Sequence, residues 1–538
     1  MDSRKLHWSI FITIFCFGRG LGYNPVNTGH VNLPVPGVST IPSMSPSDPA
    51  TLQISNWASQ NTISIAGTVR DEHGCPVPSL TASLGIGTRG NLLLQDVILI
   101  DEIGAFNRHG AFGYFRVTHD ISTLTKADFL NEVGKTTRVL IRVSTAGSIS
   151  GSSDMEREGR GFAIKFYTAD GNFDLAGTTG VTFPIRDPML FTDLSRSRGR
   201  NPQTFAKDIT MRWDFSTHRP EGILYLLKVF SDFGANSRVI DMYGVHAFKF
   251  VNRNGIPVFV KFHVLSQQPF RWWNDTELAT VSGSDPDHAT RDLYDAIANQ
   301  NFPKWTLKIQ VMTAEQALKY PVNPFDATKV WRQEEFPLIP VGEIVLNENP
   351  VNVFNDIEQA AFSPARMVPG IEPSPDRLLI GRMFAYGDAQ RYRLGVNYAQ
   401  LAVNRPIMQQ VKNYVRDGFM RENPNGGGSP NYFPNSFHGP TPNQTATENV
   451  FHVNGVVDRI DTGDDVEDNF RLARLYLYKD LTVVQRRRVA QNLGNSLAKA
   501  IKEIREKAAR ELFFRITPEF GKQVWDDMQA AVTANNAH

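Results

Sequence analysis

The sequence predicts an α+β protein with a large antiparallel β core and a helical C-terminal region. Between about residues 110 and 345, apolar and polar residues alternate in short runs separated by turn residues, which is typical of half-buried strands. From residue 465 onward, apolar residues recur every three to four positions between charges, which is typical of amphipathic helices. The chain has 538 residues, of which 41% are hydrophobic, so it is long enough to bury a large core.

The first 22 residues have the pattern of a secretory signal peptide. Arg4 and Lys5 precede an apolar run from Ile10 to Phe17, which is too short to cross a hydrocarbon core of about 30 Å. We expect cleavage near Gly22 and therefore a secreted, extracellular protein. An N-terminal apolar helix that packs on the body of the protein is the alternative. Cleavage would leave Cys75 as the single cysteine, so no internal disulfide is expected.

Charge and composition narrow the range of partners. The formal net charge is +1, so no global field favours nucleic acid or an acidic membrane surface, and no later segment reads as a membrane span. The basic cluster at 486–488 lies in the helical region, where we expect it to pair with nearby acids on a solvated face. The sequons at Asn274 and Asn443 suit passage through the secretory pathway.

The chain divides by composition into five parts. After the signal peptide at 1–22, residues 23–79 are rich in Pro, Ser, Thr and Asn and predict an extended arm, either a disordered linker or a segment ordered against a neighbouring subunit. Residues 80–345 form the β core. Residues 346–450 carry frequent Pro and Gly and predict a long wrapping loop. Residues 451–538 form the helical region.

The β core reads as a closed or nearly closed barrel. Residues 137–145 and 160–175 alternate or run apolar between turn residues, and Asn254-Gly255 separates two strand-like runs, which predicts a hairpin. Helical inserts such as residues 288–300 interrupt the strands. Strands of this kind with helical inserts favour an antiparallel barrel with helices.

One short pattern carries chemistry. In the segment 376–398, Arg382 and Tyr386 are four residues apart and share one face of a helix. A guanidinium on that face stabilises the phenolate form of tyrosine, and a tyrosinate can serve as an axial ligand of haem iron. Alone, the pair is weak evidence, because a packed tyrosine covered by an arginine is the more common explanation of this spacing.

The surrounding segments resemble the haem catalases, in that family's order. The matching stretches are LLLQD (92–96), FGYFRVTHD (112–120), RGFAIKFYTADGNFDL (160–175), NPFDATKVW (323–331), VGEIVLNENPVN (341–352) and EQAAFSPARMVPGIEPSPDRLLIGRMFAYGDAQRYRLG (358–395). The resemblance implies an eight-stranded antiparallel barrel with N-terminal arm, wrapping loop and C-terminal helices. It also implies a buried haem b and an intertwined homotetramer.

The resemblance also assigns residues to the proximal side of the haem. Tyr386 matches the iron ligand, and Arg382 matches the arginine that keeps it ionised. The other matches are Arg142 and Arg393 for haem propionates, Phe183 and Phe191 beside the porphyrin, Ser144 behind the distal histidine, and Asp376 with His246 as a proximal hydrogen-bonding pair. The proximal half of the site is therefore expected to be intact.

The distal half departs from the family. Catalase chemistry needs a base beside the iron and a polar donor for the second peroxide oxygen. The family takes these from an R-x-x-H-A-K-G segment and a D-L-x-G-N-N turn. Here Arg108 is followed directly by His109, so the segment with the distal histidine and one propionate arginine is absent, and Thr178 stands at the asparagine position. His109 is out of register and would have to re-form the loop to reach the iron. A skipped exon could explain the gap but not Thr178.

Smaller departures affect other parts of the family pattern. Gln390 replaces a histidine, and the W-P-H-G-D-Y segment, where some catalases bind NADPH, reads WRQEEF at 331–336, so NADPH binding is not expected. The leading interpretation is a secreted pseudoenzyme with a binding or structural role, able to hold haem or a small molecule in the pocket. The alternatives are an active extracellular catalase or peroxidase that decomposes hydrogen peroxide, with His109 or water as base, and a haem-free storage or assembly protein.

Overall fold

The computed structural model describes residues 69–70, 76–77, 108–145, 152–234, 236–408, 418, 419, 421, 424, 427–438 and 468–536. By its internal contacts the chain divides into two compact units, residues 1–61 and 62–538, and every described residue belongs to the second. The expected signal peptide, the arm apart from four residues, and the sequon at Asn443 lie outside the described residues. The domain boundaries drawn from composition stay predictions.

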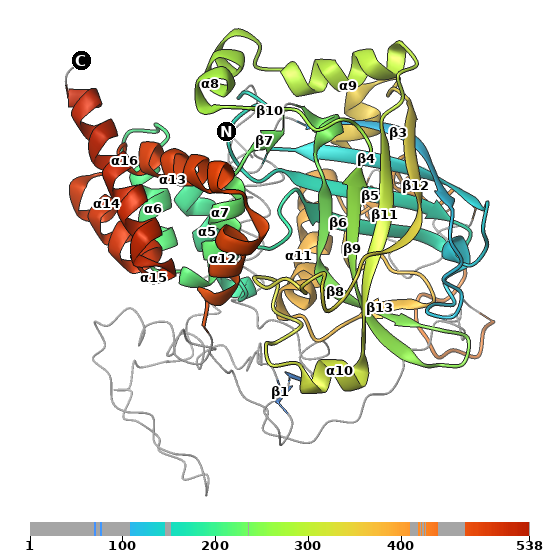
Figure 1. The fold of residues 1–538 in the computed structure, drawn as a ribbon. Helices are drawn as coiled ribbons and strands as arrows, with labels where there is room; N and C mark the ends of the chain where they lie inside the picture. The colour runs from blue at the N-terminus through green and yellow to red at the C-terminus, as the bar shows by residue number, and fades with distance from the viewer. Residues whose placement is uncertain are drawn as a thin grey trace, which may run out of the picture. The chain divides into compact units, whose positions relative to one another are not determined.

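Eight antiparallel strands close into a barrel (Figure 1). They are β3 (Arg108–Val117), β4 (Thr136–Ser144), β5 (Gly161–Thr168), β6 (Gly171–Thr178), β8 (Met242–Val251), β9 (Pro257–Ser266), β11 (Lys304–Thr313) and β12 (Ile339–Glu348). The order around the barrel is β8, β6, β5, β4, β3, β12, β11 and β9, and pairing of β9 with β8 closes it. The predicted fold class is confirmed.

The remaining strands are short and lie outside this ring. They are β1 (Val69–Arg70) with β2 (Pro76–Val77), β7 (Phe233–Gly234) with β10 (Trp272–Trp273), and β13 (Ile371–Pro373), which adds to the edge of β8. The predicted hairpin at Asn254-Gly255 is also confirmed, because β8 and β9 are joined there and Gly255 takes a positive φ of 75°.

The barrel interior is filled by every second residue of each strand. Phe115, Phe166 and Phe173 come from β3, β5 and β6 and are no more than 1% exposed. Phe166 lies 5.6 Å from each of the other two, between ring centroids. Aromatic side chains of this size bury large apolar areas and prefer such edge and tilted contacts. The strand alternation in the sequence therefore corresponds to a packed core rather than a pore.

Twelve helices are described. They are α5 (Phe191–Arg198), α6 (Ile209–Thr217), α7 (Ile223–Val229), α8 (Asp275–Ser284), α9 (His288–Ala298), α10 (Ala314–Lys319), α11 (Arg377–Leu394), α12 (Arg471–Leu475), α13 (Val483–Leu497), α14 (Lys502–Ala508), α15 (Phe514–Ile516) and α16 (Pro518–Asn536). Helix α9 confirms the insert predicted at 288–300, and α12 to α16 confirm the C-terminal helical region. In the described residues, no helix is both long and apolar enough to cross a membrane.

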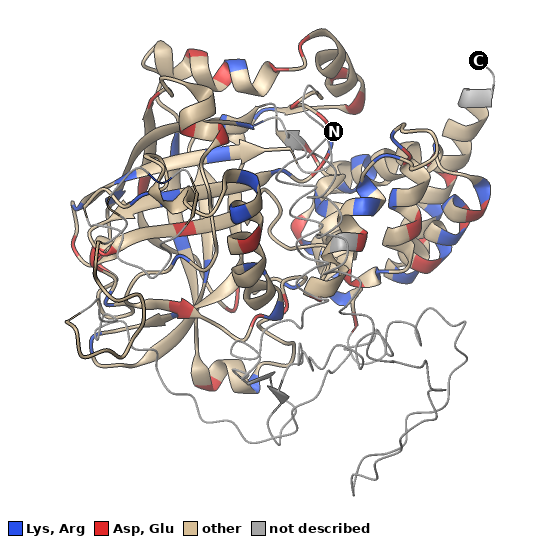
Figure 2. Cartoon of the chain, turned by 180° about the vertical axis from the view of Figure 1, so that it is seen from behind, with Lys and Arg blue, Asp and Glu red and all other residues tan. Residues whose placement is uncertain are grey.

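The C-terminal helices share a second core with α6 and α7. Trp213 of α6 lies within 6.0 Å of Phe513, between ring centroids, and its indole nitrogen donates to Ser496 of α13. Of the basic cluster at 486–488, Arg487 pairs with Asp527 and Arg488 pairs with Asp232. Figure 2 shows basic and acidic residues interspersed over these helices and the barrel. Two of the three arginines are therefore paired with acids, as predicted, whereas Arg486 donates to the carbonyl of Leu477 and lies over the ring of Tyr478.

The positions of Arg108 and His109 in strand β3 determine on which face of the barrel wall each side chain lies. The strand begins at Arg108, and Arg108 lies opposite Ser144 in the register with β4. Successive side chains of a strand point to opposite faces. His109 therefore shares the inner face with Ala111 and Phe115, which belong to the barrel core, whereas Arg108 shares the outer face with Phe112.

Candidate functional site

A cavity lies on the outer face of the barrel, between its wall and helices α5, α7 and α11. Its lining is Arg108, Arg142, Ser144, Thr145, Gly159, Arg160, Gly161, Gly177, Thr178, Phe183, Pro184, Phe191, Leu194, Ser195, Arg198, Tyr225, Arg382 and Tyr386. Seven residues that the sequence assigned to a haem site are in this set. Three more lie behind the lining: Arg393 shares an acceptor with Arg142, His246 contacts Arg382, and Asp376 contacts His246.

Helix α11 presents the tyrosine and arginine pair to this cavity. The helix begins after Asp376, whose carboxylate accepts from the backbone N–H of Leu379 at 3.0 Å and caps the first turn. One turn apart on the helix, Arg382 Nη2 donates to the phenol oxygen of Tyr386 at 2.7 Å. Arg382 is 5% exposed, so a fixed positive charge lies against a tyrosine oxygen that faces the cavity.

A buried histidine and carboxylate fix the orientation of that arginine. Arg382 Nη1 donates to Nε2 of His246 at 2.7 Å, and Nδ1–H of His246 donates to Asp376 Oδ2 at 2.7 Å. Burial lowers the pKa of His246, with Asp376 acting in the opposite direction. A neutral ring with its proton on Nδ1 is what this chain of hydrogen bonds requires. The sequence-predicted pair of Asp376 and His246 is therefore formed and reaches Tyr386 through Arg382.

His246 is aimed by a bulge in β8. The pairing register with β9 shifts between Tyr243 and Ala247, and Val245 has a φ of 63°, which is unusual for a β-branched residue. Bulges bend a strand and redirect its side chains, often beside functional sites. No signal in the sequence marks this bulge.

Beside the cavity, arginines converge on one short segment of backbone, residues 358–360. Arg142 Nη1 donates to the carbonyl of Ala360 at 2.6 Å, and Arg393 Nη2 donates to the same carbonyl at 2.9 Å. Arg393 also donates to the carbonyl of Glu358 and to Gln390 Oε1. The two predicted propionate arginines are therefore brought together, and Gln390 orients one of them.

Sequence reasoning missed a third arginine at this segment. Arg108 Nη1 lies 2.8 Å from Glu358 Oε2, and its side chain is 4% exposed. The strand alternation of β3 was the signal that would have placed it on the outer face.

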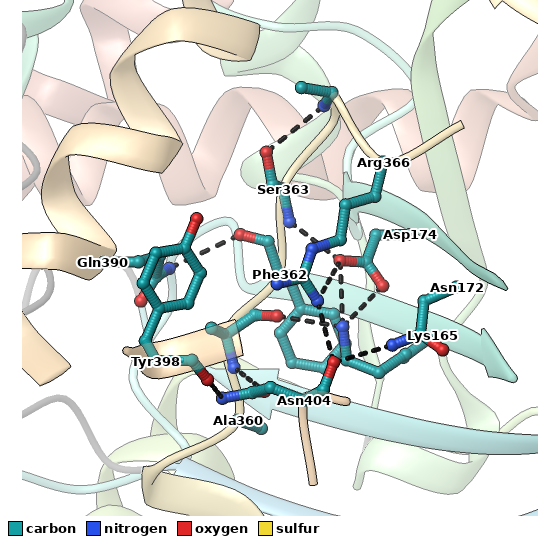
Figure 3. A network of polar contacts seen from close by, with 12 residues as sticks. Lys165, Asn172, Asp174, Ala360, Phe362, Ser363, Arg366, Gln390, Tyr398 and Asn404 are labelled. Carbon is teal, nitrogen blue, oxygen red and sulfur yellow. Dashed lines mark hydrogen bonds and ion pairs between the residues drawn. The ribbon is translucent and has the colours of Figure 1, made fainter. Parts of the chain in front are cut away.

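A buried ion pair holds the segment that carries these carbonyls (Figure 3). Lys165 Nζ lies 2.6 Å from Asp174 Oδ1 and donates to the carbonyl of Ala361 at 2.9 Å. Asp174 Oδ2 accepts from the backbone N–H of Ser363 at 3.0 Å. Asn404 accepts from the N–H of Ala361 at 2.7 Å, so the loop after α11 is tied to the same segment. Strands β5 and β6 thus fix residues 360–363 against the barrel.

Two aromatic rings form an apolar wall of the cavity. Phe183 and Phe191 are stacked, with ring centroids 5.7 Å apart and planes 7° from parallel. Together with Tyr386 and the arginines, they give the cavity one flat apolar wall, one phenol oxygen and several cations. This donor set fits a flat aromatic macrocycle with an oxygen-ligated metal and peripheral carboxylates.

Of the distal residues that the sequence indicated, Ser144 and Thr178 lie at the cavity and His109 does not. The Thr178 hydroxyl donates to the carbonyl of Gly180 at 2.9 Å and accepts from the N–H of Gly180 at 3.0 Å, so its own turn engages it. The lining here also includes Arg160 and Arg198, with Arg198 Nη1 3.4 Å from the hydroxyl of Tyr225, which sequence reasoning did not identify.

His109 does not line the cavity. Its Nε2 is 2.8 Å from Ser237 Oγ, and the residue is 6% exposed. Burial lowers its pKa from 6.5 to about 4, with Asp154 acting in the opposite direction. His109 is therefore a neutral side chain on the inner face of β3.

A second cavity, of about 430 Å³, lies at the segment where some catalases bind NADPH. Trp331, His263 and Lys228 contribute to its lining. Arg332, also in the lining, pairs with Glu334 at 2.8 Å and with Asp480 at 3.1 Å. The absence of NADPH binding stays a prediction.

The closed barrel, with a tyrosine and arginine pair held beside it, has the architecture expected of the haem catalases. A catalase family profile matches residues 70–439. The chain is 46% identical over 465 residues to the catalase of Glandirana rugosa, covering 84% of this chain and 88% of that protein. It is 43% identical over 500 residues to the catalase of Drosophila melanogaster, covering 90% and 98%.

Solved structures give the same result. Catalase A from Saccharomyces cerevisiae aligns with a TM-score of 0.73 and 37% identity, covering 78% of this chain and 88% of that one. A bacterial catalase aligns with a TM-score of 0.74 and 34% identity, covering 86% and 96%. The chain belongs to the catalase family.

Proposed function

We propose that this protein is a secreted haem protein of the catalase family with little or no catalase activity, whose role is binding or structural. The observation that carries this proposal is the lining of the cavity. Among the described residues that line it there is no histidine, aspartate or glutamate, and the one histidine near the join, His109, faces the barrel interior.

The missing base matters because of the chemistry. Decomposition of peroxide needs a group beside the iron that takes a proton from one oxygen and returns it to the other. A threonine whose hydroxyl is bound within its own turn cannot supply it. Ser144 lines the cavity, but a hydroxyl without a partner base is a poor proton acceptor at neutral pH.

The residues present fit haem b. Tyr386 would supply an oxygen ligand to the iron, with the Arg382 guanidinium beside it, while Arg142 and Arg393 would hold propionates. Phe183 would pack against the ring. When bound, haem would supply a redox-active iron, and the side chains of this protein would hold it in position.

An active extracellular catalase or peroxidase is the alternative function. Its support is the complete proximal arrangement of Tyr386, Arg382, His246 and Asp376, together with 43–46% identity to catalases over most of the chain. Under this alternative, water would replace the distal base, or His109 would do so after β3 rearranged.

Localisation and assembly belong to the same proposal. The N-terminal pattern supports secretion, and family membership supports a homotetramer. A small molecule that binds in the same cavity, near Arg160 and Arg198, is also part of this proposal.

The test is an absorption spectrum and an oxygen-release assay on the secreted protein. We expect a Soret band with a charge-transfer band typical of ferric haem bound by a phenolate, and oxygen release from peroxide at least a hundredfold slower than that of a catalase measured in parallel. Tyr386→Phe should lose the charge-transfer band and most of the haem. Tyr392→Phe is the matched control, because Tyr392 lies on the same helix and is 71% exposed.

Each outcome distinguishes the alternatives. Oxygen release near the rate of the parallel catalase would overturn the proposal, and its loss in His109→Ala would then identify His109 as the base. A protein that takes up no haem would support the storage or assembly role. Unchanged haem content in Tyr386→Phe would remove the assignment of the axial ligand.

A further inference from the structure

The second cavity, of about 430 Å³, is lined by an amine that the haem site does not use. Lys228, near the end of α7, contributes this amine, and its Nζ lies 3.8 Å from the ring centroid of Tyr476. Across the part of the chain that the structure describes, the ammonium group of Lys228 forms no hydrogen bond or ion pair. Ammonium groups withdrawn from water are usually paired, so an unpaired one beside a cavity indicates room for a ligand.

The charged groups around this cavity balance one another. Arg332 pairs with the carboxylates of both Glu334 and Asp480. Burial lowers the pKa of His263 to about 4, so its ring is neutral near neutral pH. With Lys228, the described lining therefore carries two positive and two negative charges. A polyanion would find no surplus of positive charge here, whereas a neutral ligand would leave the balance unchanged.

The rest of the lining suits a ligand with an apolar body. Its volume lies in the range of about 300–1,000 Å³ that is typical of small-molecule sites. The side chains of Glu334 and Asp480 are 52% and 39% exposed, so the cavity reaches the protein surface on that side. Five lining residues are apolar or aromatic without a charge: Val181, Leu224, Val330, Trp331 and Leu472.

Burial makes the amine of Lys228 a better nucleophile. It lowers the pKa of Lys228 to about 8, with Asp480 acting in the opposite direction. At about pH 7.4, roughly a fifth of this amine is then neutral, against about a thousandth of an ordinary lysine. Only the neutral amine attacks a carbonyl carbon, and removal of lysine from water is one way in which proteins activate it for imine formation.

We propose that Lys228 binds a small aldehyde with an apolar body as an imine in this cavity. The lone pair of Nζ bonds to the carbonyl carbon, both amine protons pass to the carbonyl oxygen, and the oxygen leaves as water, so that a C=N bond remains. No oxidant or reductant is needed. The described lining residues of this cavity and of the cavity that contains Tyr386 do not overlap, so the inference goes beyond the proposed haem binding.

A purely structural role for Lys228 makes a different prediction. Its charge above Tyr476 would then serve only to hold α7 against the C-terminal helices. In that case the amine would stay protonated against the ring, and Lys228 would react with an aldehyde no faster than a lysine at the surface.

The experiment is reductive trapping of the full-length protein with benzaldehyde and sodium cyanoborohydride at about pH 7.4, followed by digestion and mass spectrometry. We expect benzylation of Lys228 at least about tenfold faster than that of Lys479 and Lys319, whose side chains are 60% and 74% exposed. The rate at Lys228 should saturate with benzaldehyde and should fall when benzyl alcohol is added, because the alcohol has the same shape but forms no imine. Lys228→Arg keeps a positive charge at this position and should remove the fast-labelled site.

Each outcome decides for or against the inference. Trapping at Lys228 no faster than at the two exposed lysines would overturn it. Fast trapping that neither saturates nor responds to benzyl alcohol would show a reactive amine without a ligand site and would also overturn it. The lysines are compared within one protein, so the result stands even if Lys228→Arg does not fold. A spectrum without haem would count against the proposed function alone, since the trapping does not depend on haem.

Discussion

Replacing Lys165 by methionine tests the ion pair that holds residues 360–363 beside the cavity. Both side chains of the pair are fully buried, and Asp174 also accepts from the N–H of Ser363. Methionine keeps the length of the lysine stem but removes the charge. The variant therefore leaves a carboxylate in the barrel wall whose nearest other cation, Arg366, is 3.8 Å away.

The magnitude follows from the cost of an uncompensated buried charge. Removing one partner of a buried ion pair destabilises a protein by about 3–5 kcal/mol. Arg366 compensates part of this, so we expect about 3 kcal/mol for Lys165→Met. In Lys165→Met/Asp174→Leu the charge is gone, but the N–H of Ser363 loses its acceptor, which costs about 1–3 kcal/mol. The double variant should therefore recover part of the loss.

The assay is urea unfolding of both variants, followed by tryptophan fluorescence and circular dichroism in parallel. Lys319→Met is the control, because Lys319 and Glu315 form a pair whose side chains are about three-quarters exposed, and exposed pairs contribute about 0–1 kcal/mol. A loss below about 1 kcal/mol in Lys165→Met, or a double variant less stable than the single one, would refute the reasoning. Haem release should also accelerate in Lys165→Met, since the Ala360 carbonyl moves with this segment.

Two other predictions concern histidines. His109 has a folded-state pKa of about 4 against 6.5 when unfolded, so the unfolded chain binds the extra proton first and stability falls as the pH drops from about 6.5 to about 4. Between pH 7 and pH 4.5, the free energy of unfolding of His109→Gln should therefore fall by up to about 3 kcal/mol less than that of the unaltered protein, as measured by urea unfolding. An equal fall in both proteins would contradict this prediction. Asp376→Asn should turn an amide N–H toward His246 and disturb Arg382, shifting the charge-transfer band of bound haem. Asp388→Asn on the same helix should leave that spectrum unchanged.

The barrel was predictable because apolar and polar residues alternate along the strands, or because turn residues bound their apolar runs. Helices α6 and α7 were not predictable from the sequence. The sequence of α7, ILYLLKV, is apolar on nearly every face, and a run this short reads equally as a buried strand. Its helical state is set by the C-terminal helices that cover it, in a core formed by residues more than 200 positions away in the sequence.

In the candidate site, too, local contacts were predictable from the sequence and long-range contacts were not. Arg382 and Tyr386 are on one helix, so their contact follows from local spacing. The contribution of Arg108 depends on the phase of β3 against β4 and on a loop that starts more than 200 residues later. Sequence reasoning treated the gap at Arg108 only as a loss, because a contact between residues 250 positions apart has no motif.

Holding a haem and breaking an oxygen–oxygen bond place different demands on this fold. The contacts that would hold the haem come from α11, β4 and residues 358–360. Turnover also needs a proton acceptor, and the described lining residues include no histidine, aspartate or glutamate. The two demands therefore fall on different residues, so haem binding can persist in a protein of this fold that has little turnover.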